Sequence, residues 1–363
     1  MNCIFVLSIN RKERHMKKGI LLVNLGSPDS PNPKDVKTYL DEFLMDPRVI
    51  DLPKWARTIL VKGIVLNTRP KASAKAYKKI WWEEGSPLIV LSERLQEKIQ
   101  KQVDYPIALA MRYGSLTIKN GLQELVDQGV DDVLLIPLYP QYAMATTETI
   151  LVLAEEERQK HFPDIKITDF KPFYNNPEYI KVLSESIAEH IKDKDIEHLL
   201  FSYHGVPYRH IRKSDITKSH CNPKVKTNCA CCKTPSPAHE FCYKHQCVEV
   251  TRLVGEYLNL EEGTYSTTFQ SRLGFDPWLQ PYTDRTIEKF GKNGMKKMAV
   301  VTPAFVSDCL ETLEEIAMEG EEIFHEVGGK EFTTIPCLND NQDWVDLLSK
   351  WINEWATAPV ATV

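Results

Sequence analysis

The sequence contains no hydrophobic run long enough to cross a membrane and no excess of positive charge. None of its windows approaches the roughly 20 apolar residues that a membrane-spanning helix requires. Its 45 basic and 50 acidic side chains give a formal charge of −5, which does not favour nucleic acid or anionic lipid as a partner. The apolar residues 1–9 lack the basic start and the cleavage site of a secretory signal. We therefore expect a cytoplasmic protein that binds no nucleic acid.

The phosphate-binding fingerprints of nucleotide enzymes are also missing. The loops that follow the apolar runs at 19–25 and 199–203 contain neither G-x-G-x-x-G nor G-x-x-x-x-G-K-[ST]. This absence argues against a dinucleotide-dependent oxidoreductase. What the sequence does contain is 363 residues, of which 42% are hydrophobic and 26% are charged. That length and composition suit two domains with packed cores.

Short apolar runs alternate with helical patterns along the whole chain. This alternation is typical of parallel sheets flanked by helices. Four strands are expected before Pro172 and four after it, over residues 19–25, 107–111, 133–138, 165–170, 199–203, 265–269, 298–302 and 332–336. The predicted fold class is α/β, with two doubly wound lobes that are each built on a four-stranded parallel sheet.

The same alternation predicts the domain boundaries. We expect an N-terminal extension outside the fold, a first lobe, a second lobe, and a C-terminal helix with a tail, over residues 1–17, 18–173, 174–340 and 341–363. Met16 is an alternative to Met1 as the first residue, because it directly precedes the first predicted lobe.

Polar residues stand at the ends of two predicted strands. The segments LLVNLGSP (21–28) and LLFSYHGVP (199–207) each run from an apolar strand into a polar residue, a glycine and a proline. Ligands of open α/β sheets bind beyond the carboxyl ends of the strands, so Asn24 and His204 are candidates for a binding site. A histidine at such a place is either a hydrogen-bonded structural residue or a base and metal ligand.

Four glutamates follow the predicted strand at 298–302. Their spacings of 4, 4 and 3 residues place Glu311, Glu315, Glu319 and Glu322 along one stripe of a helix. An acidic stripe is usually a solvated face, yet like charges at i,i+4 destabilise a helix by roughly 0.2–0.5 kcal/mol per pair. A path for cations along the helix would explain the stripe, because bound cations offset the repulsion between the glutamates.

Seven motifs resemble those of the ferrochelatase family and occur in the order of that family. They are LLVNLGSP (21–28), YKKIWWEEGSPL (77–88), MRYG (111–114), PLYPQYAMATT (137–147), FSYHGVP (201–207), TFQSRLGFDPWLQPYTD (268–284) and AFVSDCLETL (304–313). The resemblance implies two Rossmann-like lobes with a porphyrin cleft between them. It also implies that Fe²⁺ is inserted into protoporphyrin IX to give protohaem and two protons, as the last step of haem biosynthesis.

Other activities remain open at this point. The chain could act on coproporphyrin, insert another metal such as cobalt, or carry haem without catalysis. The segment Asn24-Leu25-Gly26 resembles the protoporphyrin type. A non-catalytic carrier is expected to lose the acidic partner of His204, but Glu311 and Asp308 are both present.

The resemblance implies roles for individual residues. His204 and Glu311 would form the metal site and, with Asp308, the catalytic group, while Glu315 and Glu319 would deliver iron. The porphyrin would contact Leu25, Arg69, Ser86, Arg112, Tyr113, Tyr139, Trp278 and Phe305. A neutral imidazole titrates near working pH and binds Fe²⁺, so we expect His204 to remove pyrrole protons. Cys309 stands where the family motif has a histidine, and we expect a buried thiol there.

The segment 220–247 holds six of the nine cysteines. Its prolines and polar residues predict a loop that needs a cross-link or a bound metal to be ordered. Four thiolates suit a [2Fe–2S] cluster, which some members of the family carry and which we favour, with a structural Zn²⁺ or unliganded thiols as the alternatives. Cys221, Cys229, Cys232 and Cys242 are candidate ligands, and the choice of four among the six cysteines stays open.

An apolar stretch at 43–60 is expected to form the lip of the porphyrin cleft. Apolar side chains at such an exposed edge favour contact with a membrane surface. Besides porphyrin and ferrous iron, the sequence therefore suggests peripheral contact with a membrane.

Overall fold

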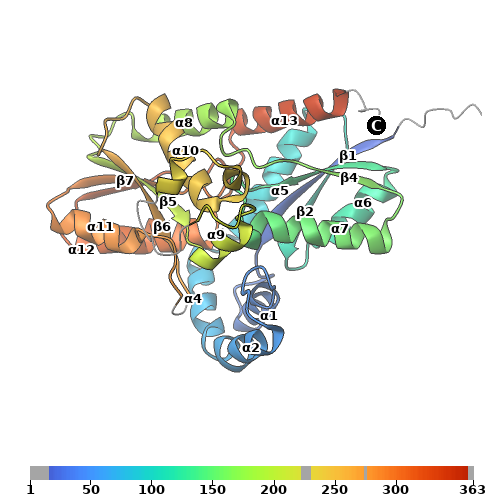
Figure 1. The fold of residues 1–363 in the computed structure, drawn as a ribbon, viewed down its shortest axis with the longest axis horizontal. Helices are drawn as coiled ribbons and strands as arrows, with labels where there is room; N and C mark the ends of the chain where they lie inside the picture. The colour runs from blue at the N-terminus through green and yellow to red at the C-terminus, as the bar shows by residue number, and fades with distance from the viewer. Residues whose placement is uncertain (1–15, 222–229, 274–275, 359–363) are drawn as a thin grey trace, which may run out of the picture.

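The computed structural model describes residues 16–221, 230–273 and 276–358. It contains two parallel four-stranded sheets, with strand orders β2-β1-β3-β4 and β6-β5-β7-β8. Their bounds are β1 Lys18–Gly26, β2 Ile107–Tyr113, β3 Asp132–Pro137, β4 Lys166–Asp169, β5 His198–His204, β6 Tyr265–Gln270, β7 Lys297–Val301 and β8 Glu331–Thr334. The predicted pair of four-stranded parallel sheets is confirmed, and Figure 1 shows the sheets on opposite sides of the molecule.

The central strands β1 and β5 are apolar along nearly their whole length. Ile20, Leu21, Leu22 and Val23 of β1 have no exposed surface. Successive side chains of a strand point to opposite faces, so burial of all four means that helices cover both faces of the sheet. This is why the strand appears in the sequence as a continuous apolar run and not as an alternating one.

Helices cover both sheets. In the first lobe these are α5 Pro87–Gln100, α6 Ile118–Asp127, the π-helix η2 Met144–Glu148 and α7 Thr149–His161. In the second lobe they are α8 Pro177–Ile191, α9 Tyr208–Ser214, the 3-10 helices η3 Ala230–Cys232 and η4 Pro237–Phe241, α10 Tyr243–Tyr257, α11 Thr283–Lys292, the π-helix η5 Glu311–Gly320, α12 Glu321–Glu326 and α13 Gln342–Thr357.

The two lobes share one hydrophobic core. A single cluster of buried side chains contains Leu22 of β1, Phe201 of β5 and Trp344 of α13. Helix α13, red in Figure 1, packs on α5 of the first lobe and on α8 of the second. Its Trp344 lies with its ring centroid 5.6 Å from that of Phe173, the connection between the lobes. This shared core therefore fixes the position of one sheet relative to the other.

A helical lip is inserted in the sequence between β1 and α5 of the first lobe. It consists of α1 Pro33–Leu44, α2 Lys54–Thr58, the π-helix η1 Ile59–Val65, α3 Leu66–Thr68 and α4 Pro70–Ile80. Figure 1 shows these helices in blue, projecting below both sheets. The lip has a small core of its own, which includes Leu44, Val61 and Leu66.

The cysteine-rich segment differs from its sequence prediction in one respect. We expected a loop as far as residue 247, but α10 begins at Tyr243. Cys242 and Cys247 are buried, and Cys247 has no exposed surface. The helix continues the segment into the hydrophobic core, and this tertiary packing is not visible in its local composition. Cys229 lies outside the described residues.

Candidate active site

A cleft of about 1000 Å³ lies between the lobes and the lip. Its walls come from the ends of β1 and β5, from the lip helices and from η5. Nine of the residues predicted for the site line it, namely Leu25, Arg69, Tyr139, His204, Trp278, Phe305, Glu311, Glu315 and Glu319. The parallel topology explains why these residues come together, because the carboxyl ends of parallel strands lie at the same edge of each sheet.

His204 is the last residue of β5. Its Nδ1 lies 2.7 Å from the carbonyl oxygen of Gly205. A carbonyl accepts only, so Nδ1 donates, and in the neutral imidazole Nε2 is the nitrogen with the lone pair. The Phe305 ring lies edge-on to the imidazole, with the centroids 6.5 Å apart. The imidazole is thus prepared to accept a proton or to bind a metal through Nε2.

Three of the four glutamates of the acidic stripe lie on η5, which is a π-helix and not the expected α-helix, whereas the exposed Glu322 lies on α12. Glu311, Glu315 and Glu319 all line the cleft. Burial, and then the neighbouring Glu311, raise the pKa of Glu315 to about 7, although Ser271 Oγ donates a hydrogen bond to its carboxylate. The pKa of Glu319 is raised as well, by burial and by Glu314. Carboxylates that repel one another in this way gain most from a cation or a proton between them.

Tyrosine side chains form the wall beside Glu311. Tyr39, Tyr77 and Tyr139 are buried and line the cleft. Burial raises the pKa of each hydroxyl well above its usual range, so all three stay protonated at neutral pH. The Tyr139 hydroxyl has no hydrogen-bond partner in the described part of the chain. It therefore offers a donor to a bound ligand.

Comparison with known proteins agrees with this cleft. A model of the ferrochelatase family matches residues 17–356. The chain belongs to the ferrochelatase family. A ferrochelatase of Opitutus terrae is 44% identical over 344 residues, which cover 94% of this chain and 98% of that protein. One of Pseudomonas fluorescens strain Pf0-1 is 46% identical over 332 residues, which cover 91% and 96%. The predicted family is confirmed, and the chain is a tetrapyrrole metal chelatase whose family implies porphyrin and ferrous iron as substrates.

Solved structures show the same chelatase fold. The structure of SirB from Bacillus subtilis with Fe³⁺ matches with a TM-score of 0.53 at 12% identity, over 94% of this chain and 96% of SirB. A cobalt complex of the sirohydrochlorin chelatase SirB from Bacillus subtilis subspecies spizizenii matches with a TM-score of 0.53 at 13% identity, over 95% and 97%. At such low identity these matches show the fold alone.

Four residues predicted from the ferrochelatase motifs do not line the cleft described here. Arg112 Nη2 lies 2.5 Å from the Asp46 carboxylate, and the Tyr113 hydroxyl donates to the same oxygen at 3.0 Å. Both side chains therefore hold the segment after α1 against β2, and neither is among the residues that line this cleft. Ser86 is buried at the start of α5.

Asp308 is the fourth of these residues, and its carboxylate is engaged. It accepts hydrogen bonds from Thr312 Oγ1 at 2.8 Å and from Asn339 Nδ2 at 2.7 Å. These bonds fasten the start of η5 to the loop after β8, so Asp308 positions Glu311 without lining the cleft itself. The neighbouring Cys309 is 6% exposed, and burial raises the pKa of its thiol well above the usual range.

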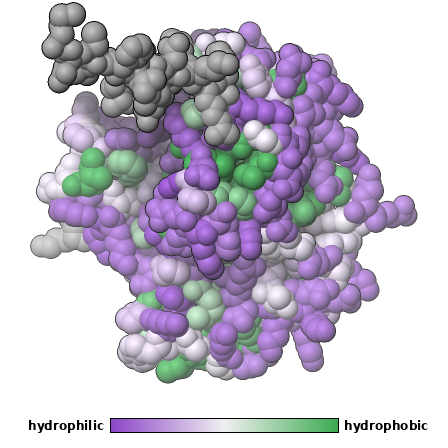
Figure 2. All heavy atoms as spheres, turned by 90° about the vertical axis from the view of Figure 1, so that its right-hand side faces the viewer, coloured by the Kyte–Doolittle hydropathy of each residue, from purple (hydrophilic) through white to green (hydrophobic). Residues whose placement is uncertain are grey.

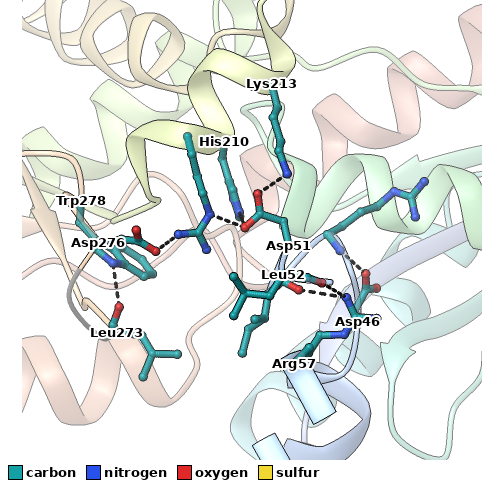
Figure 3. A network of polar contacts seen from close by, with 12 residues as sticks. Asp46, Asp51, Leu52, Arg57, His210, Lys213, Leu273, Asp276 and Trp278 are labelled. Atoms are coloured by element: carbon teal, nitrogen blue, oxygen red, sulfur yellow. Dashed lines mark hydrogen bonds and ion pairs between the residues drawn. The ribbon is translucent and has the colours of Figure 1, made fainter. Parts of the chain in front are cut away.

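An ionic network ties the lip to the second lobe across the mouth of the cleft (Figure 3). The Asp51 side chain is 3% exposed and contacts Arg209, Lys213 at 2.5 Å and His210 at 3.4 Å. Arg209 also pairs with Asp276. Burial alone would raise the pKa of Asp51, but hydrogen bonds from Lys213 and Arg209 outweigh it and lower the pKa to about 2.

Our sequence reasoning missed this network and most of the tyrosine wall. Tyr39 and Tyr77 have the spacing of ordinary core positions on their helices, so only the fold shows that they face the cleft. Arg209 and Lys213 are spaced i,i+4 directly after the FSYHGVP motif. That spacing indicates that both cations lie on one face of a helix, but it does not identify Asp51 as their partner.

Proposed function

We propose that the chain inserts Fe²⁺ into protoporphyrin IX, which gives protohaem and releases two protons. The observation that carries this proposal is the pair formed by His204 and the η5 carboxylates in one cleft. His204 Nε2 has the lone pair that accepts pyrrole protons. Glu311 supplies an anionic oxygen in the same cleft, a ligand type that suits Fe²⁺.

The lining of the cleft supports a large, flat and mainly apolar ligand. Leu25, Trp278 and Phe305 supply apolar and aromatic surface from both lobes. Arg69 supplies a cation for the propionate groups, and the Tyr139 hydroxyl supplies a donor. A volume of about 1000 Å³ is ample for a macrocycle of porphyrin size.

The outer carboxylates support delivery of iron and removal of protons. Glu315 has a pKa of about 7, so it exists in both protonation states near neutral pH. It can accept a proton that leaves the cleft and release it without a large barrier. Glu319 lies further along the same helix and is exposed, as an entry position requires.

An anaerobic assay with purified protein tests the proposal. Fe²⁺ and Co²⁺ are each supplied with protoporphyrin IX and with coproporphyrin, and insertion is followed by absorbance. We expect the fastest turnover with Fe²⁺ and protoporphyrin IX. Faster turnover with coproporphyrin or cobalt would reassign the substrate, and tight haem binding without any turnover would indicate a carrier.

The cysteine-rich segment supports a second, structural metal group. Burial raises the pKa of the Cys242 thiol to about 11, with smaller contributions from the nearby thiols of Cys221 and Cys231. Thiolates suit a [2Fe–2S] cluster, with Zn²⁺ as the alternative. Within 16–221, 230–273 and 276–358, however, no three Cys, His, Asp or Glu side chains are arranged to hold a metal ion. Binding through Cys221, Cys232 and Cys242 would therefore need Cys229 and local rearrangement.

Metal and sulfide analysis tests the bound group. We expect two irons and acid-labile sulfide per chain, and loss of colour in Cys232→Ser. Thermal stability should fall with the colour, because the binding energy of a structural metal site is largely folding energy. One zinc per chain without sulfide would identify a zinc site in place of the cluster. If protein purified anaerobically contained no metal at all, both the cluster and the zinc site would be refuted.

The lip supports contact with a membrane surface from the cytoplasmic side. Leu52, Trp55, Ile59 and Ile64 are exposed, Trp55 by 71%. Figure 2 shows hydrophobic side chains among hydrophilic ones over the lip, at the bottom of the view. No described helix is both long and apolar enough to span a bilayer. Co-sedimentation with phospholipid vesicles should therefore be reversible, and it should weaken in Trp55→Ala, whereas unchanged sedimentation would refute the lip as the contact.

A further inference from the structure

Tyr243 connects the cysteine-rich segment to the reacting histidine. It is the first residue of α10 and directly follows Cys242. Its side chain is 6% exposed, and its ring lines the cleft. Its hydroxyl donates a hydrogen bond of 2.9 Å to the backbone carbonyl of His204. A residue that is remote in sequence from the FSYHGVP motif therefore contacts the backbone of the group expected to carry the chemistry.

The peptide after His204 is fixed from both sides. The His204 carbonyl accepts from Tyr243, and the Gly205 amide donates to the Gln270 carbonyl at 2.6 Å. The Gly205 carbonyl in turn accepts from His204 Nδ1 at 2.7 Å. That carbonyl belongs to the next peptide, so the fixed His204–Gly205 peptide orients it through the Gly205 backbone and thereby orients the imidazole ring. Tyr243 acts on the imidazole through the backbone and without touching the ring.

Gln246 holds the start of α10 in place. This residue has no exposed surface, and its side-chain oxygen accepts from the Tyr142 amide at 2.7 Å. Its side-chain nitrogen donates to the carbonyls of His239 at 3.1 Å and Glu240 at 2.8 Å. Tyr142 belongs to the loop whose residues Gln141 and Ala143 line the cleft from the first lobe. Segment 237–247 therefore contacts both walls, and Tyr243 is anchored on each side.

We propose that Tyr243 is a positioning residue for metal insertion, because its hydroxyl holds the His204 backbone in the orientation that points Nε2 into the cleft. This inference rests on the proposed function of His204. The cysteine-rich segment would then contribute to the reaction by holding Tyr243, which orients His204 through the backbone.

The test is Tyr243→Phe, which keeps the ring that lines the cleft and removes only the donor. In the full-length protein kcat for insertion of Fe²⁺ into protoporphyrin IX should fall about tenfold, the effect of losing about one hydrogen bond in the transition state. The KM values for porphyrin and iron should stay within about twofold, since neither ligand is bound by the hydroxyl. A merely structural role would instead change thermal stability and KM together with kcat.

Tyr257→Phe is the matched control. Tyr257 lies on the same helix, is 43% exposed, and donates its hydroxyl to the Glu185 carboxylate at 2.9 Å. We expect wild-type kcat in this variant. An unchanged kcat in Tyr243→Phe overturns the inference, and so does a loss that merely parallels a loss of folded protein measured by circular dichroism. A wild-type protein without any insertion activity would refute the proposed function first, so the two failures are distinguishable.

Discussion

The two lobes have the same topology but supply different chemistry to the cleft. In each sheet a central strand ends in a polar residue followed closely by a glycine, Asn24-Leu25-Gly26 at the end of β1 and His204-Gly205 at the end of β5. Asn24 is buried, and its amide nitrogen lies 3.2 Å from Ser92 Oγ. His204 lines the cleft, and its Nδ1 lies 2.7 Å from the Gly205 carbonyl oxygen. Equivalent positions in one fold thus carry a structural hydrogen-bonding group and the residue that we propose as the base.

The remaining cleft residues extend this contrast. The first lobe supplies the lip, Arg69 and the tyrosine wall, which suit binding, whereas the second supplies His204 and the η5 carboxylates, which suit proton and metal transfer. If this division holds, changes in the second lobe should lower kcat, and changes in the lip should raise the KM for porphyrin.

His204→Ala gives the largest expected effect. Removal of the base should lower kcat by about 10²–10⁴-fold, the usual contribution of a positioned acid–base group. Porphyrin binding, measured by fluorescence titration, should remain within a few-fold of wild type because the first lobe is intact. His190→Ala, an exposed histidine on α8, is the control. Insertion retained within tenfold of wild type would remove His204 from the mechanism.

Glu311→Gln comes next, because it keeps shape and removes charge. We expect kcat to fall by about 10²-fold if the carboxylate contacts iron or accepts a proton in the transition state. The exposed Glu326→Gln on α12 should be silent. If Glu311→Gln raised only the KM for iron, the residue would belong to delivery and not to the reaction.

Much of the fold and of the candidate site in the second lobe could be predicted from the sequence, because local patterns indicate both. Apolar runs such as residues 19–25 specify strands by themselves, His204 stands directly after such a run, and Glu311 begins the helix that follows the run at 298–302. Topology then brings them together without further information. Tyr243 and Asp51 could not be found in this way, because their partners lie 39 and 158 residues away in the sequence.

Two charged residues of the motifs, Arg112 and Asp308, do not line the cleft as we expected. Arg112 and Asp308 are chemically suited to a ligand, but each is occupied by a protein partner, Asp46 and Asn339 respectively. A buried charged group must be paired, and the sequence does not show whether the partner is the protein or the substrate.

Asp51→Asn tests whether the lip serves binding. The substitution removes the charge that holds Arg209 and Lys213, and the expected loss of stability is about 1–3 kcal/mol, towards the low end because Lys213 is half-exposed. The KM for porphyrin should rise with little change in kcat. The exposed pair of Asp195 with Lys297 provides the control Asp195→Asn. A fall in kcat at constant KM would contradict the division between the lobes.

The pH dependence of that variant follows from the pKa of Asp51. Its folded pKa of about 2 lies below the ordinary value of 3.8. A depressed carboxyl pKa stabilises the fold above the unfolded pKa, and the contribution is lost as pH falls towards the folded value. The difference in unfolding free energy between wild type and Asp51→Asn should therefore be constant above pH 5 and shrink from about pH 4 downwards.

Glu315→Gln has the smallest expected effect and tests the acidic stripe. Loss of one carboxylate should raise the KM for Fe²⁺ about fivefold, which corresponds to about 1 kcal/mol of lost attraction. The folded pKa of about 7 lies above the ordinary 4.5, so wild-type Glu315 gains its charge as pH rises through 7. The wild-type KM for iron should therefore fall between pH 6 and pH 8, and the variant should lack this change. Glu326→Gln again serves as the control, and an iron dependence identical in all three proteins would make the stripe a solvated face.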